Sequence, residues 1–159
     1  MSRDVLLNGK VSEVEILEFK AGANSYGVNV SDIKEILPYN NKYKAIPNSH
    51  PHIEGIIMPR DFLITIVNFK DCLKLADIDE NKNEMLIVTS INDLNIAFHV
   101  DSVSGIHRLT TDNITEPGKK ISTTEKSYVI GIFAKEDKKI EIVDLRAIIR
   151  NINPNVMVD

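Results

Sequence analysis

The chain repeats one pattern of apolar and polar residues, so its fold must hold two similar units within 159 residues. Residues 28–33 (VNVSDI) are matched by 98–103 (FHVDSV), 53–57 (IEGII) by 129–133 (VIGIF), and 64–69 (ITIVNF) by 140–145 (IEIVDL). Ile36 is matched by Ile106 in the same alignment. A single match of this kind arises easily between unrelated strands, but several in the same order indicate an internal duplication.

Alternating apolar and polar residues indicate short strands throughout both repeats. We expect strands at residues 13–19, 26–30, 53–58, 63–69, 85–91, 95–100, 128–134 and 140–145. Short helices are expected at residues 32–37, 69–75 and 145–152. Ser31 and Asp144 are suited to cap the first and the last of these helices, which Pro38 and Pro154 would end.

Each repeat is too small to bury a comfortable core by itself. Closing about five strands into a barrel removes exposed sheet edges, and packing two barrels together buries more apolar surface. We therefore expect a mainly β fold with two barrel subdomains, residues 13–76 and 84–145, and a groove between them. The polar residues 77–83 would connect the two subdomains.

Composition and charge exclude several classes of protein. The net charge is −4 with both signs mixed along the chain, which argues against a basic face for nucleic acid. Cys72 is the single cysteine, so no intrachain disulfide is possible and a reducing compartment fits. The polar start is unlike a signal peptide, and no apolar run approaches the roughly 20 residues that span a bilayer. We expect a cytoplasmic protein that neither binds nucleic acid nor inserts into a membrane.

A search for catalytic or ligand-binding motifs finds little. Cys72 follows an expected core strand, where a buried inert thiol is the expectation. His50 and His52 have a spacing that metal ligands can use, but no cysteine cluster or second histidine motif accompanies them. No nucleophile elbow and no phosphate-binding glycine loop is present. We therefore expect a protein that is not an enzyme and needs no metal or cofactor.

Several motifs resemble the CheW-like domain of bacterial chemotaxis over essentially the whole chain. Residues 26–30 (YGVNV) with 33–36 (IKEI) look like the first hairpin of the family and the acidic segment after it. Residues 46–51 (IPNSHP) with 53–57 (IEGII) look like its centre, and residues 64–69 like its next strand. The apolar opening around Leu6 and Leu7 and the PNSHP run are most similar to the N-terminal domain of CheV.

The resemblance implies one CheW-like domain over residues 1–159, with helical segments at both ends and without the receiver domain that CheV carries. It implies two intertwined five-stranded SH3-like barrels. It also implies two partners, the cytoplasmic tip of a chemoreceptor and the regulatory domain of the histidine kinase CheA. The function implied is that of a non-enzymatic adaptor between them. A small-barrel nucleic-acid-binding protein and a hydrolase or metalloenzyme are the alternatives.

Carried over residue by residue, the resemblance places Glu35 and Arg60 at the acidic and basic signature positions of the family. With Gly55 and the repeat-related residues Ile33, Ile36, Val100 and Val103, they are the expected partner-binding positions. We expect Glu35 and Arg60 to form a partly buried pair; the alternative is an exposed pair worth at most about 1 kcal/mol. Gly55 would allow close backbone approach, or mark a bulge. Of the four aliphatic residues, some would be core and some would line the groove. Pro59 and Asp61 depart from the Leu and Gly of the family pattern beside Arg60.

Overall fold

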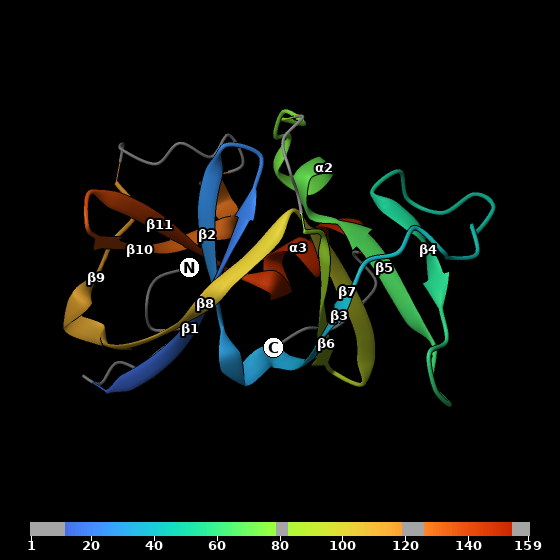
Figure 1. The fold of residues 1–159 in the computed structure, drawn as a ribbon, viewed down its shortest axis with the longest axis horizontal. Helices are drawn as coiled ribbons and strands as arrows, with labels where there is room; N and C mark the ends of the chain where they lie inside the picture. The colour runs from blue at the N-terminus through green and yellow to red at the C-terminus, as the bar shows by residue number, and fades with distance from the viewer. Residues whose placement is uncertain (1–11, 79–82, 119–125, 154–159) are drawn as a thin grey trace.

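The computed structural model describes residues 12–78, 83–118 and 126–153. The expected helical segment at the start of the chain and the helix stop at Pro154 lie outside these residues. Two β-sheets stand side by side, and the helix α3 lies against the seam between them (Figure 1). The mainly β architecture with short helices is confirmed.

Sheet 1 has six strands and sheet 2 has five. The order in sheet 1 is β8 (Ser102–Thr110), β1 (Glu13–Ala21), β2 (Asn24–Asn29), β11 (Lys138–Val143), β10 (Val129–Lys135) and β9 (Ile114–Thr115). The order in sheet 2 is β3 (Ile33–Pro38), β6 (Met85–Ile91), β7 (Leu94–Val100), β5 (Ile64–Asn68) and β4 (Ile53–Ile57). The helices are η1 (Val30–Asp32), α2 (Phe69–Leu73), η2 (Thr111–Asn113), η3 (Lys126–Tyr128) and α3 (Leu145–Ile152).

The two repeats exchange strands. Sheet 1 joins the hairpin β1–β2 of the first repeat to β8, β10 and β11 of the second, and sheet 2 joins β6–β7 of the second to β3, β4 and β5 of the first. Each sheet has two junctions between the repeats: a parallel one, β2 with β11 or β5 with β7, and an antiparallel one, β1 with β8 or β3 with β6. The strand pairing therefore cuts across the expected subdomains 13–76 and 84–145. A hydrophobic pattern specifies that a strand forms but not which copy of the repeat supplies its neighbour.

Three apolar clusters account for this arrangement. One lies inside each sheet, and a larger shared core lies between the sheets. Ile16 belongs to the interior of sheet 1 while its neighbour Leu17 belongs to the shared core, as expected when successive side chains point to opposite faces. Ile66 and Val67 divide in the same way in sheet 2. The central strands are therefore covered on both faces, which explains their nearly continuous apolar sequences.

Two ion pairs hold the segments where the chain passes from one sheet to the other. Lys70 of α2 lies 2.9 Å from Asp101, between β7 and β8, and the two side chains are 10% and 9% exposed. Arg146 of α3 donates two hydrogen bonds, of 2.9 and 3.0 Å, to Asp32 at the crossover between β2 and β3. Lys70 and Arg146 each follow the first residue of their helix, so the repeat places a cation at both crossovers.

The structure contradicts the expected helix at residues 32–37. Only Val30–Asp32 forms a 3-10 turn, and Ile33–Pro38 is the strand β3. Its pairing with β6 shifts register between Ile33 and Glu35, which is a bulge with one extra residue. The bulge brings Ile33 and Ile36 to the same face and so imitates the spacing of a helix. The other two helices are confirmed, and the side chain of Asp144 accepts the expected capping bond from the Arg146 backbone N–H at 3.0 Å.

The exchange of strands predicts that neither half of the chain folds alone. A chain divided between residues 80 and 81 should give two fragments that each lack a strand signal in circular dichroism, because each sheet takes strands from both halves. Mixing the two fragments should restore the signal with a cooperative thermal transition. A cooperative transition of either fragment by itself would contradict the prediction.

Candidate functional site

The residues expected to bind partners do not all reach the surface. Val100 is completely buried in the shared core, so its expected contact with a partner is wrong. Its position at the end of β7, a strand covered on both faces, is the physical reason. Ile33 and Ile36 on β3 and Val103 on β8 are partly buried and pack against the margin of that core. These three side chains remain candidates for contact with a partner.

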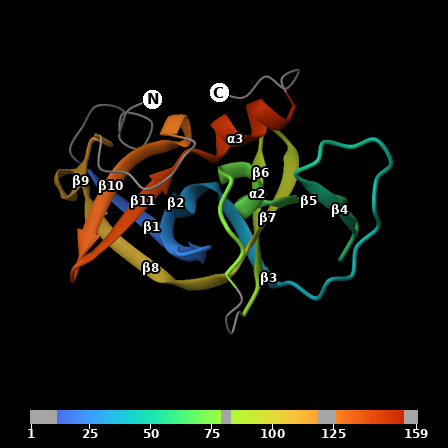
Figure 2. The ribbon, with the colours of Figure 1, turned by 90° about the horizontal axis from the view of Figure 1, so that it is seen from above.

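A fourth apolar residue belongs with these three. Ile106 on β8 is 58% exposed, although its repeat partner Ile36 packs against the shared core. The bulge that separates Val103 from Gly105 in the pairing with β1 puts Val103 and Ile106 on one face. The strands β3 and β8 lie on the side of the molecule opposite α3 (Figure 2). We call Ile33, Ile36, Val103 and Ile106 the β3–β8 face.

The expected pair of Glu35 and Arg60 forms, but it is not buried in the expected way. An amino group of Arg60 contacts a carboxylate oxygen of Glu35, and the two side chains are 55% and 21% exposed, with Arg60 the more exposed. Solvent therefore screens the pair, and its contribution to the free energy of unfolding is at most about 1 kcal/mol. Phe62 lies beneath two cations, with Lys34 Nζ at 3.8 Å and Arg60 Cζ at 5.5 Å from the ring centroid. The guanidinium thus stays accessible in a fixed position.

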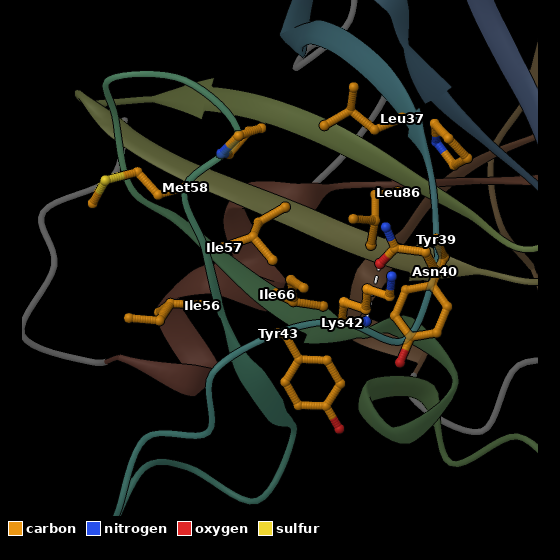
Figure 3. A pocket seen from close by; sticks show the side chains of 12 residues that line it. Leu37, Tyr39, Asn40, Lys42, Tyr43, Ile56, Ile57, Met58, Ile66 and Leu86 are labelled. Atoms are coloured by element: carbon orange, nitrogen blue, oxygen red, sulfur yellow. Dashed lines mark hydrogen bonds between the residues drawn. The ribbon is translucent and has the colours of Figure 1, made fainter.

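The interior of sheet 2 opens into a cavity of about 450 Å³, which we call the barrel-end pocket (Figure 3). Its wall is mostly apolar and comes from β3, β4, β5, β6 and the connections after β3 and β4. The lining residues are Leu37, Pro38, Tyr39, Asn40, Lys42, Tyr43, Ile56, Ile57, Met58, Pro59, Ile66 and Leu86. Two of them, Tyr43 and Met58, are substantially exposed. Sequence reasoning missed this site, although tyrosines within the otherwise polar residues 39–44 were a signal.

Gly55 lies at the edge of this pocket. Lys44 pairs with Ile56 through two backbone hydrogen bonds of 2.9 Å, which brings residues 43 and 44 directly over Gly55. A Cβ atom on Gly55 would lie 2.5 Å from the Lys44 carbonyl oxygen and against the ring of Tyr43. The expected close backbone approach is confirmed, and a register shift between Ile53 and Gly55 shows the bulge as well.

A cluster of ionisable side chains contacts Tyr39, one of the residues that line the barrel-end pocket. The two ring nitrogens of His99 lie 2.5 Å from Glu54 and 3.0 Å from Glu84, and the ring of Tyr39 stacks on the imidazole with centroids 3.6 Å apart. Tyr39 donates a 2.6 Å hydrogen bond to Glu54, and Asn68 donates another at 3.1 Å. Burial acts to raise the pKa of Glu54, but the hydrogen bonds from His99, Tyr39 and Asn68 and the charge of His99 outweigh it, so that the pKa is lowered.

Cys72 and the two neighbouring histidines, His50 and His52, do not form a reactive site. Burial raises the pKa of Cys72 to about 12, so the thiol stays protonated and unreactive, as expected. The ring centroids of His50 and His52 lie 4.7 Å apart. Burial, and to a smaller extent the charge of the neighbouring His52, lowers the pKa of His50. In residues 12–78, 83–118 and 126–153, no three His, Cys, Asp or Glu side chains are grouped as metal ligands.

Among the helices of the described residues, none is both long and apolar enough to cross a bilayer.

Comparison with known proteins identifies relatives for this arrangement. The profile of the CheW-like domain matches residues 15–153. The chemotaxis protein CheW of Thermotoga maritima is 27% identical over 143 residues, which are 86% of this chain and 93% of that protein. The chemotaxis protein CheV3 of Helicobacter pylori is 24% identical over 157 residues, which are 92% of this chain and 50% of that protein. Identity to CheW proteins is thus as high as to CheV, so the expected finer likeness to CheV does not stand out.

A solved structure shares the fold. The scaffolding protein TtCheW from Thermoanaerobacter tengcongensis superposes with a TM-score of 0.79 at 22% identity, and the match covers 93% of this chain and 100% of that one. The expected architecture of two intertwined barrels is confirmed by this likeness, with β9 as a sixth strand in sheet 1.

The contacts of Gly55 predict that Gly55→Ala lowers the free energy of unfolding by about 1–3 kcal/mol, because the added methyl group meets backbone atoms that must move. Urea denaturation monitored by circular dichroism measures the change. Gly118→Ala is the matched control, since a Cβ there meets nothing within 4 Å. Equal stability of the two variants would show that residues 43 and 44 do not hold this position in solution.

The lowered pKa of Glu54 predicts a dependence of stability on pH. A carboxyl with a lowered folded pKa stabilises the protein above its unfolded pKa of about 4.3, and this contribution disappears as the pH falls through the folded value. Glu54→Gln should therefore cost about 1.5–3 kcal/mol at pH 7, with the difference shrinking below about pH 4. Denaturation of both proteins across this range tests it, with exposed Glu116→Gln as control. A difference independent of pH would assign the loss to packing.

Proposed function

Because this chain belongs to the CheW-like domain family, it is an adaptor of chemotaxis signalling, and we propose that it holds a chemoreceptor tip and the histidine kinase CheA on separate surfaces. The observation that carries the proposal is the β3–β8 face, an apolar surface beside a charged pair at the two signature positions of the family. Such a protein acts through its surfaces and needs no catalytic group of its own. Binding the cytoplasmic tip of a receptor would place it in the cytoplasm.

The β3–β8 face has the character of a site for a helix. Ile33, Ile36, Val103 and Ile106 present partly or largely exposed aliphatic groups, and an amphipathic helix binds such a surface through the apolar stripe on one side. Arg60 adds a charge that is exposed but oriented by Glu35 and Phe62. A receptor helix would bury its apolar stripe on the face and meet the guanidinium with a carboxylate or a carbonyl group.

An adaptor can couple two partners because the surfaces that bind them are rigidly connected. The β3–β8 face draws on one strand from each sheet, and the exchanged strands and the shared core join the two sheets. A partner bound at this face therefore has a fixed orientation relative to the far ends of both sheets. This supports a second docking surface for the kinase away from the receptor helix.

The proposal predicts how two substitutions in the protein change its affinity for a peptide of the receptor tip and its free energy of unfolding. Arg60→Ala and Ile106→Ala should each weaken its binding by about tenfold, because each removes an exposed contact group. Neither should change the free energy of unfolding by more than about 1 kcal/mol. Isothermal titration calorimetry and urea denaturation measure the two quantities.

The control is Arg108→Ala, because Arg108 is 71% exposed on the same strand as Ile106 and pairs only loosely, at 3.4 Å and longer, with Glu13 and Glu15. Its affinity for the receptor peptide should equal that of the original protein. Failure of both the receptor peptide and the regulatory domain of the kinase to bind at tens of micromolar would refute the proposed coupling.

A further inference from the structure

The duplication provides an internal comparison for the barrel-end pocket. In sheet 1 the short strand β9 covers the edge of β10, with Thr115 opposite Ile132 and Ile114 opposite Phe133. Ile114 is completely buried and belongs to the apolar cluster inside the sheet. A Cβ on Gly131 would lie 2.6 Å from the side chain of Ile114, so the glycine makes room for this residue. Ile114, a branched aliphatic side chain from β9, thus fills the interior of sheet 1 beside β10.

The same position in sheet 2 is not filled. Lys44 pairs with Ile56 as Thr115 pairs with Ile132, but within the described residues no pair follows between Tyr43 and Ile57. Tyr43 takes the place of Ile114 over the corresponding glycine, Gly55, yet remains 40% exposed. The ladder therefore stops one residue early, and the interior of sheet 2 stays open as the barrel-end pocket.

The dimensions and the charge of this pocket limit what fits it. Its volume of about 450 Å³ lies within the range of about 300–1,000 Å³ typical of ligand sites and exceeds the need of one side chain. An occupant would bring an aliphatic group together with flanking backbone. Lys42 lines the pocket, and Lys44 lies two residues further along the chain. Neither side chain has an ion-pair partner within the described parts of the chain. Acidic residues on the occupant would complement them.

The segment that closes sheet 1 has this chemistry. Residues 109–117 (LTTDNITEP) carry Ile114 in extended conformation, the two acidic residues Asp112 and Glu116, and no basic residue. A folded second copy cannot supply Ile114, because that residue is buried in its own sheet. A segment of a different protein with the same chemistry is the occupant that these observations favour.

We propose that the barrel-end pocket is a docking site for an extended acidic segment of another protein, which inserts one branched aliphatic side chain where sheet 1 holds Ile114. The segment would lie along β4 beyond the bridge at Lys44 and replace the missing pair opposite Ile57. Leu37, Ile66 and Leu86 would contact the inserted side chain. The pocket and the β3–β8 face share β3, but Leu37 lines the pocket and packs against the apolar cluster inside sheet 2, whereas Ile33 and Ile36 pack against the shared core.

A peptide of residues 109–117 is the probe for the intact protein. In a titration followed by nuclear magnetic resonance, it should bind saturably and perturb the signals of Tyr43 and Ile57. The same peptide with Ile114→Ala should bind at least about tenfold more weakly, because it lacks most of the buried apolar surface. Exchanging Asp112 and Glu116 for lysine should also weaken binding, and added salt should reduce the affinity of the acidic peptide.

Variants of the protein complete the test. Ile57→Phe, which copies Phe133 of sheet 1 into the pocket, should reduce peptide affinity at least about tenfold while the protein keeps a cooperative thermal transition. Ile106→Ala on the β3–β8 face is the matched control and should bind the peptide unchanged. Equal affinity of the original peptide and its Ile114→Ala version overturns the proposal, and so does the lack of saturation at about 1 mM peptide. Dimerisation of the protein that the peptide cannot reverse would assign the pocket to a second copy and overturn it too.

Discussion

Four strand pairs join the two halves of the chain, and both sheets depend on them: the parallel pairs β2 with β11 and β5 with β7, and the antiparallel pairs β1 with β8 and β3 with β6. Each pair connects a strand of one repeat to a strand of the other. Without these pairs, the hairpins would expose unpaired edges. With them, every central strand is covered on both faces, and the shared core holds the sheets in one orientation. This is the mechanical basis for an adaptor that fixes one partner relative to another.

The duplicated frame carries different side chains at equivalent surface positions. Ile36 packs on the shared core, while Ile106 at the matching position of β8 points into solvent. Ile114 fills sheet 1, while Tyr43 leaves sheet 2 open. Matched buried positions, such as Val28 with Phe98 and Phe69 with Leu145, by contrast stay apolar in both repeats. The exposed positions of the two repeats can differ independently, because close packing constrains the residues of the core and not those at the surface.

The sequence was sufficient for most local elements and insufficient for their partners. Alternating hydrophobicity located the hairpins, and the Asp144 cap marked the last helix, because both signals are local. The exchange of strands is not local, since equivalent strands of two repeats have equivalent patterns. The bulge after Ile33 turned a strand into an apparent helix, and the two-residue strand β9 is too short to produce a period. Val100 shows the same limit at the level of sites, because a position that the repeat singles out can still be completely buried.

The charged groups divide according to burial, and this division separates frame from surface. Lys70 and Asp101 are about nine-tenths buried, and Lys70 also contacts the exposed Asp77 at 2.5 Å, so removing Lys70 would strip Asp101 of this counter-charge inside the protein, a loss of roughly 3–5 kcal/mol. Arg60 is more than half exposed, so Glu35 contributes little to stability through it. What Glu35 does provide is orientation, because it holds the guanidinium beside Phe62 without desolvating it. The exposed guanidinium of Arg60 remains largely hydrated, so a partner's carboxylate or carbonyl group can replace this water. Lys70, by contrast, is nearly buried in its ion pair at the crossover.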